Sequence, residues 1–289
     1  MQADREITAL FTLIDDPDME VYDRVSKKIL TYGTGIIPNL ENLWELSPAD
    51  HVQHRIEMLI HRLHYRDLKQ EFLLWKNHSY NDLLRGAALT ARFQYPDLET
   101  ISISQELEKI RKNIWIEINN YFTPLEKTQI ICSILYNYYA VKGAEVNYTK
   151  PDEFFIHKLL QSKKGNTINI GVLYLILTEL LALPVFAIHV PKQFVLAYFH
   201  PDFDLESYEG NPKEKIHFYI DATTGQAFSQ NDLDNYFKRI SVPQVPSYYK
   251  PLSNIQVIKV LLEELSQCFS DELHAYKQKE LKHISSILD

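Results

Sequence analysis

The sequence is poor in glycine, in cysteine and in positive charge, and each shortage argues against a class of protein. Glycine occurs 8 times in 289 residues, which together with long periodic stretches favours helices over a turn-rich β-sandwich. Two cysteines, Cys132 and Cys268, are too few for a disulfide framework and fit a reducing compartment. The formal net charge is −8, which argues against the basic face that nucleic-acid binding needs.

Long apolar runs are missing as well. The longest, Val172–Leu177, is followed by Thr178 and Glu179 and is too short to span a bilayer. The first residues, MQADREITALFTLIDD, lack the charged start and the apolar run of a signal peptide. We therefore expect a cytoplasmic protein with neither a membrane nor a nucleic acid as its partner.

Sequence motifs for common cofactors are also absent, because the chain contains no Walker loop, GxGxxG, HExxH or paired CxxC. We expect no cofactor. Histidines recur on one side of a predicted helix, at His51, His54, His61 and His64. They share that side with Gln, Arg and Glu residues and with no cysteine, so we interpret them as a solvated polar face, with a metal site as the alternative.

Helical patterns fill residues 1–95. Asp16-Pro17 predicts one helix start, Ile36-Ile37-Pro38 a second and Ser47–Asp50 a third. The third helix carries an apolar stripe formed by Val52, Ile56, Leu59, Ile60 and Leu63. The first two helices resemble one HEAT-like repeat, although no strict period follows.

The middle of the chain contains a strong helix start and a cysteine in an apolar setting. Thr123-Pro124-Leu125-Glu126 predicts a capping box with Pro at the first helical position. Cys132 follows among apolar residues, so we interpret it as a small buried hydrophobe. The alternative, a nucleophile, requires a nearby base or a helix N-terminus that lowers its pKa.

An enclosed helix and three strands follow. A short helix over 151–164 is predicted to end with Gly165 as its C′ residue. The next helix, Asn169–Leu181, is apolar on nearly every side, so other elements must enclose it. Apolar segments predict three strands, at Val185–Val190, Phe194–Phe199 and Lys215–Asp221.

The last part of the chain is predicted to be helical. Ser229–Phe237 makes a small helix. Three prolines from Val242 onward predict an extended linker, and residues 253–269 and 271–288 a helix pair. These patterns together predict a predominantly helical α+β fold with three parts: a helical region at 1–95, a core at 96–241, and a linker with the helix pair at 242–289.

The core resembles the SirB1 family, also called transglutaminase-like core 2, in the order of several short motifs. The matching segments are Tyr95-Pro96-Asp97-Leu98, Asn147-Tyr148, Lys164–Asn169, Leu173-Tyr174-Leu175, Leu183-Pro184-Val185, Pro191–Val195 and Tyr219-Ile220-Asp221. The resemblance implies a papain-like or transglutaminase-like core, with a central helix against a small antiparallel sheet. It also implies that the final helix pair is similar to a tetratricopeptide-like tail.

Active relatives carry a Cys at the start of the central helix, a His on the sheet and an Asp that orients it. The resemblance places Asn169, Gln193 and Asp221 at these three positions, and the helix alignment could slip by one residue to Ile170. Carboxamides do not titrate near neutral pH, so Gln193 cannot act as a general base. We expect a hydrogen-bonded polar cluster of these three residues, or a ligand pocket that also includes Thr167, Tyr174, Lys192 and Tyr219.

We therefore expect a protein without this covalent catalysis, serving as a binding or interaction module for a protein or peptide. One alternative is a hydrolase or amidotransferase with an unconventional nucleophile such as Cys132 or Thr167. Another is a structural subunit of a larger assembly. The sequence predicts neither an oligomeric state nor the identity of the partner.

Overall fold

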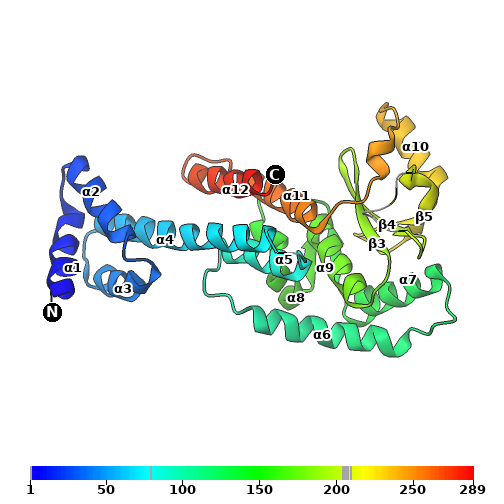
Figure 1. Ribbon diagram of the computed structural model, residues 1–289, viewed down its shortest axis with the longest axis horizontal. Coiled ribbons are helices and arrows are strands. Elements are labelled where there is room, and N and C mark those ends of the chain that lie inside the picture. The colour runs from blue at the N-terminus through cyan, green and yellow to red at the C-terminus, as the bar shows by residue number, and fades with distance from the viewer. Residues whose placement is uncertain (1, 79, 204–207, 209) are drawn as a thin grey trace. The chain divides into compact units, whose positions relative to one another are not determined.

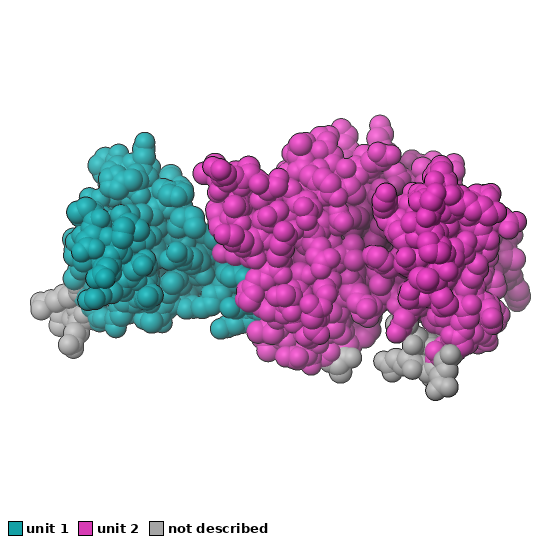
Figure 2. Space-filling model, turned by 90° about the horizontal axis from the view of Figure 1, so that it is seen from above, with its two compact units in different colours: residues 1–71 teal, residues 72–289 magenta. Residues whose placement is uncertain are grey.

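The computed structural model describes residues 2–78, 80–203, 208 and 210–289. The chain forms two units, Met1–Glu71 and Phe72–Asp289 (Figure 2). Helices make up 64% of the structure, and the sheet is small, so the predicted helix-rich α+β class is confirmed. Among the described residues, no helix combines the length and the hydrophobicity that a membrane span requires.

The N-terminal unit is built from helices. They are α1 (Gln2–Thr12), α2 (Met19–Leu30), α3 (Ile37–Leu46) and the first part of α4 (Asp50–Lys76). The predicted stripe of α4 faces the core, because Ile56, Leu59 and Leu63 are fully buried there. The N-cap of α2 is Asp18, whose carboxylate accepts from Glu20 N. The predicted start at Asp16-Pro17 is therefore two residues early.

Most of the second unit is also helical. Its helices are α5 (Leu83–Arg92), α6 (Thr100–Glu117), α7 (Pro124–Cys132), α8 (Ile156–Ser162), α9 (Thr167–Leu180), α10 (Gln230–Ile240), α11 (Asn254–Ser266) and α12 (Ala275–Ile287). A π-helical segment, Ser133–Tyr138, continues α7. The predicted capping box is present, since Thr123 Oγ1 accepts from Glu126 N while the Glu126 carboxylate accepts from Thr123 N.

The main sheet is antiparallel, and its strand order follows the chain (Figure 1). Its strands are β3 (Val185–Val190), β4 (Gln193–Phe199), β5 (Ile216–Asp221) and β6 (Ala227–Phe228). The three strands predicted from apolar segments are thus found within a residue of their expected bounds. A separate parallel pair joins β1 (Lys142–Ala144) to β2 (Lys164–Asn166), and the sequence had not predicted it.

The central helix α9 lies against one face of this sheet. Every residue from Ile168 to Thr178 is buried, as the apolar pattern predicted. Gly171 allows the close approach, because a Cβ there would lie 2.5 Å from the ring of Phe194. Helices α5, α6, α8 and α11 enclose the other sides of α9.

The opposite face of the sheet packs against α10 and the segment that follows it (Figure 1). Val195 and Tyr219 contribute from the sheet and Leu233 and Phe237 from α10. The segment predicted as an extended linker is attached to this layer. It forms a 3₁₀ turn at Pro246–Tyr249, in which Tyr249 is buried.

Candidate functional site

The start of α9 is where the family resemblance places a nucleophile. Strand β2 leads directly into the helix, and the side chain of Asn166 caps it by accepting from Asn169 N at 2.9 Å. The helix therefore begins at Thr167, two residues before the predicted start. Gly165 is not the C′ residue of the preceding helix, because Lys163 ends α8 in the left-handed conformation and Gly165 lies in β2.

Asn169 faces away from the sheet. Its side chain is fully buried, and its Nδ2 donates to the carbonyl oxygen of Glu153 at 3.0 Å. Its Oδ1 has no hydrogen-bond partner within the described part of the chain. The carboxamide of Asn169 thus links α9 to the 3₁₀ turn Pro151–Phe154 rather than to a strand.

Thr167 is the residue at this helix end that meets the β5–β6 turn. Its Oγ1 lies 2.8 Å from Thr223 Oγ1 and donates to Ala144 O at 3.2 Å. Because a hydroxyl carries one proton, the hydroxyl of Thr223 is the donor between the two threonines. The start of α9 is therefore tied to β1 on one side and to the turn after β5 on the other.

Asp221 ends β5 and holds its own turn together. Its carboxylate accepts from Thr223 N at 2.8 Å and from the hydroxyl of Thr224 at 2.9 Å, as an Asx turn requires. The backbone closes the same turn, since Gly225 N donates to Asp221 O at 2.7 Å. The resemblance assigned this carboxylate to orienting a base, but its hydrogen bonds go to the next residues of its own turn.

Gln193 opens β4 and is exposed. It pairs with Val190 across the turn that contains Lys192. Strand alternation and the pairing of Val195 with Asp221 put Gln193 and Asp221 on the sheet face that packs against α10. Phe194, which contacts α9, lies on the other face.

The three positions assigned from the resemblance therefore do not form the expected hydrogen-bonded cluster. No hydrogen bond links Asn169, Gln193 and Asp221 in the ranges that the structure describes. The amide of Asn169 is directed toward the turn before α8, while the carboxylate of Asp221 is directed into its own turn. Their assignment to triad positions stays a prediction of the sequence.

The residues of the predicted pocket are also placed apart. Thr167 lies at the start of α9, whereas Tyr174 is fully buried in the middle of that helix. Lys192 is exposed in the β3–β4 turn, where its φ is 62°. Tyr219 lies on the sheet face that packs against α10, and its hydroxyl donates to Gln230 Oε1 at 2.5 Å.

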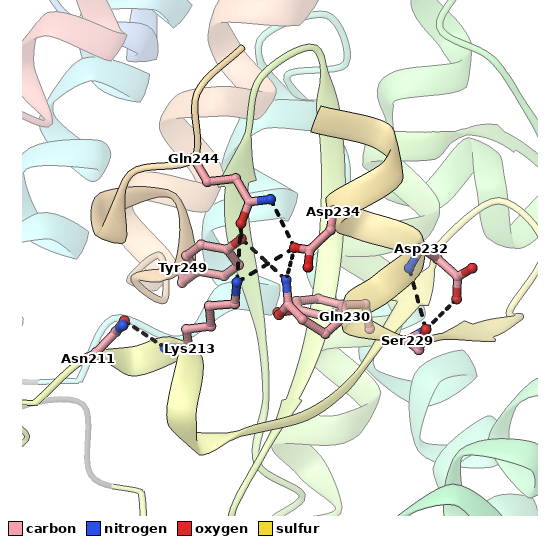
Figure 3. A network of polar contacts seen from close by, with 9 residues as sticks. Asn211, Lys213, Ser229, Gln230, Asp232, Asp234, Gln244 and Tyr249 are labelled. Carbon is pink, nitrogen blue, oxygen red and sulfur yellow. Dashed lines mark hydrogen bonds and ion pairs between the residues drawn. The ribbon is translucent and has the colours of Figure 1, made fainter. Parts of the chain in front are cut away.

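Through its bond to Gln230, Tyr219 joins a polar network that attaches α10 and the following segment to the sheet. Figure 3 labels Gln230, Asp234 and Gln244 of this network. The carboxylate of Asp234 accepts from Gln230 Nε2 at 2.6 Å and from Gln244 Nε2 at 2.9 Å, and Lys213 lies 3.6 Å away. Burial raises the pKa of Asp234, but these hydrogen bonds and Lys213 outweigh it and hold that pKa below its usual range. An ionised carboxylate whose Oδ1 is held by these neighbours is suited to a structural role.

Cys132 contacts the β5–β6 turn from the end of α7. Its Sγ donates to Gly225 O at 2.9 Å. Burial raises the pKa of this thiol to about 11, so it is protonated at neutral pH and is a poor nucleophile. The prediction that Cys132 is a small buried residue agrees with this environment only in part, because the residue is part-buried.

Sequence reasoning missed the partners of Cys132. Tyr136, in the π-helical segment, donates to Ala222 O at 2.6 Å. Gly225 has a φ of 73°, and a Cβ there would lie 2.5 Å from the ring of Tyr136. The Thr-Thr-Gly sequence after Asp221 was the available signal, because it predicts a turn that needs a left-handed residue.

Two threonine hydroxyls meet where the start of α9 contacts the β5–β6 turn. The hydroxyls of Thr167 and Thr223 bond to each other, and no titratable base contacts either one among the described residues. No group of three or more His, Cys, Asp or Glu side chains that could hold a metal ion occurs in the described part of the chain. His51 and His54 are exposed on α4, whereas His61 and His64 are half-buried, so only part of the predicted histidine face is solvated.

Comparison with known proteins identifies relatives of the region that contains this site. The sequence profile of the transglutaminase-like superfamily matches residues 101–263, more than half of the chain. The UPF0162 protein BU173 of Buchnera aphidicola subsp. Acyrthosiphon pisum (strain APS) is 24% identical over 179 residues. The aligned region spans 61% of this chain and 62% of that relative. No solved structure matches the chain.

Proposed function

Because this chain belongs to the transglutaminase-like superfamily, we propose that it is a non-catalytic member that acts as a binding or interaction module. The observation that carries the proposal is the bonding of Asp221. Its carboxylate accepts from Thr223 N and from the Thr224 hydroxyl and is directed into its own turn, so it is not available to orient a base.

The start of α9 supports the same proposal. Thr167 stands at the first helical position, and its hydroxyl is bonded to Thr223 and Ala144. A threonine nucleophile needs an adjacent base, and Gln193 is a carboxamide that cannot accept a proton near neutral pH. Cys132 has a pKa of about 11 because of burial, which makes it an equally poor candidate.

We also infer that the chain falls within the SirB1 branch of the superfamily. Tyr95 of the Tyr-Pro-Asp-Leu motif packs against the residues at the start of α8. Its ring lies edge-on to Phe155 at 5.5 Å and to His157 at 4.7 Å, and its hydroxyl donates to Asp152 at 2.7 Å. The branch motif therefore holds α8 beside the end of α5, a role that a scaffold keeps without catalysis.

The helical parts outside the sheet supply surfaces for a partner. We propose that the N-terminal unit is HEAT-like and that α11 and α12 form a tetratricopeptide-like pair, since helical repeats commonly present extended binding surfaces. The N-terminal unit exposes apolar side chains such as Met19 (59%) and Leu46 (81%). Such a module is expected to work in the cytoplasm with a protein or peptide.

Amine incorporation tests the proposal. The full chain is incubated with a glutamine-bearing protein and a fluorescent primary amine, and both isopeptide formation and ammonia release are measured. We expect the wild type and the Thr167→Val and Cys132→Ser variants to form isopeptide and release ammonia no faster than a control without protein. Turnover that either substitution abolishes would instead establish an enzyme with an unconventional nucleophile.

A further inference from the structure

A groove opens between α6 and the helix formed by α7 and the π-helical segment. Its volume is about 610 Å³, within the range of roughly 300–1,000 Å³ that is typical of ligand pockets. Ile116 forms part of one wall, and Ile130, Ile134 and Tyr138 form part of the other. All of these residues belong to the second unit.

Large apolar side chains stand exposed at the mouth of this groove. Ile116 is 70% exposed and Tyr138 is 73% exposed, while Ile134 at the floor is 9% exposed. Polar side chains, among them Asn113 and Asn137, surround them. Exposed apolar patches that are rimmed by polar residues commonly mark interaction sites.

The spacing of the apolar wall matches a helical partner. Ile130, Ile134 and Tyr138 recur every four residues and form a ridge about two turns long. A groove between two helices accepts the side-chain ridge of a third helix.

The π-helical segment directs one tyrosine into the protein and another toward the groove. Tyr139 N bonds to Ile134 O at 2.9 Å, five residues back. Tyr136 is directed inward and donates to Ala222 O, whereas Tyr138 is exposed beside the groove. Such π-helical insertions occur frequently at functional sites.

The charge of the groove defines the second property of its occupant. Glu117 lines the groove as the last residue of α6 and is exposed. It forms no ion pair with any residue that the structure describes. The carbonyl groups at the C-terminus of α6 add partial negative charge at the same end. A cationic group is therefore favoured there.

We propose that this groove binds an amphipathic helix of a partner protein, with its apolar stripe between Ile116 and Tyr138 and a Lys or Arg beside Glu117. The inference rests on the proposed function, because it names the surface through which a non-catalytic module would act.

A labelled peptide tests the groove. The probe is an amphipathic peptide of Leu and Lys, about five helical turns long, and a peptide with Glu in place of each Lys is its charge control. Binding to the full chain is followed by fluorescence anisotropy. We expect the Leu–Lys peptide to bind, and Ile116→Asp to weaken this binding roughly tenfold or more.

Two control variants, one for Ile116→Asp and one for Glu117→Lys, separate binding in the groove from non-specific binding of the peptide. Ile101 lies on the same helix and is 68% exposed, so Ile101→Asp should leave binding unchanged. Glu117→Lys should weaken binding of the Leu–Lys peptide and strengthen that of the Leu–Glu peptide. Glu272→Lys changes charge equally at another exposed site and should do neither. Circular dichroism checks that each variant is folded.

Three outcomes would overturn the groove: no binding of the Leu–Lys peptide, equal effects of Ile116→Asp and Ile101→Asp, or no response to Glu117→Lys. The same preparations are assayed for amine incorporation. Catalysis by the wild type removes the proposed function whatever the peptide does. If the groove variants fail these tests and the wild type shows no catalysis, only the proposal of this binding surface is overturned.

Discussion

The thiol of Cys132 donates a hydrogen bond to the carbonyl oxygen of Gly225, with 2.9 Å between Sγ and O. This contact joins the end of α7 to the turn between β5 and β6. Thr223 in the same turn bonds to Thr167 at the start of α9. This short turn after β5, the strand to which the resemblance assigns the acid, is thus bonded both to α7 and to the start of α9, to which the resemblance assigns the nucleophile.

Gly225→Ala should destabilise the protein by roughly 2–3 kcal/mol. Its φ of 73° disfavours a side chain, and a Cβ would lie 2.5 Å from Tyr136 and 2.8 Å from Cys132 Sγ. Gly35→Ala is the control, because nothing lies within 4 Å of its Cβ position. Thermal denaturation should show a large loss for the first variant and almost none for the second. Equal losses would contradict the packing of this turn.

Thr167→Val and Thr223→Val should be coupled. Each removes the bond between the two hydroxyls at 2.8 Å, so each should cost about 1 kcal/mol. The double variant should lose less than the sum, with a coupling energy of roughly 0.5–1 kcal/mol. Urea denaturation of the four proteins measures the cycle. Strict additivity would show that the two residues do not contact each other.

Asp221 should behave as a turn residue. Asp221→Ala removes the acceptor of Thr223 N and of the Thr224 hydroxyl and should cost roughly 1–2 kcal/mol of stability. Asp221→Asn keeps an acceptor oxygen and should retain most of that stability, because Asn also forms Asx turns. Thermal melting of both variants checks this. An Asn variant as unstable as the Ala variant would refute the assignment.

His157 should make the protein less stable in acid. It is 6% exposed, and burial, with a contribution from Lys158, lowers its pKa to about 4. Since its pKa in the unfolded chain is near 6.5, the unfolded state binds the proton first as the pH falls. Its contribution is therefore present above pH ~6.5 and is lost as the pH falls toward 4.

The expected loss from His157 is roughly 2 kcal/mol between pH ~6.5 and 4. Thermal melting across this range measures it. His157→Phe should flatten the dependence, whereas His283→Phe, at an exposed position on α12, should leave it unchanged. A wild-type profile that matches the His157→Phe profile would rule out a titration of this side chain.

Local signals in the sequence predicted much of the fold. The capping box at Thr123 and the enclosed helix α9 depend on neighbouring residues or on composition, so the pattern was sufficient. Strand β3 was predicted with its observed bounds, Val185–Val190. Its apolar run needs no knowledge of its partner strands.

The errors around α9 occurred where structure depends on distant partners. Strand β2 has three residues, Lys164–Asn166, and forms only because it pairs with β1. Gly165 therefore looked like a helix end, and the start of α9 was placed two residues late. The bond between Thr167 and Thr223 spans 56 positions in the sequence, and no local pattern reports it.

The groove could not be predicted either. Ile130 and Ile134 are among the apolar residues around Cys132, and only the position of α6 shows that an open space lies beside them. The π-helical segment that displays Tyr138 also has no sequence signature that we used. Sites formed between two helices depend on packing, which periodicity does not determine.

The alkylation rate of Cys132 tests most directly the claim that the thiol at this turn is structural and not an activated nucleophile. The folded chain is treated with iodoacetamide near neutral pH, and each cysteine is followed by peptide mass spectrometry, with urea-unfolded chain as the control. A pKa of about 11 predicts labelling roughly a hundredfold slower than in the unfolded chain, increasing toward pH 11. Fast labelling of Cys132 but not of Cys268 in the folded chain at neutral pH would contradict the account.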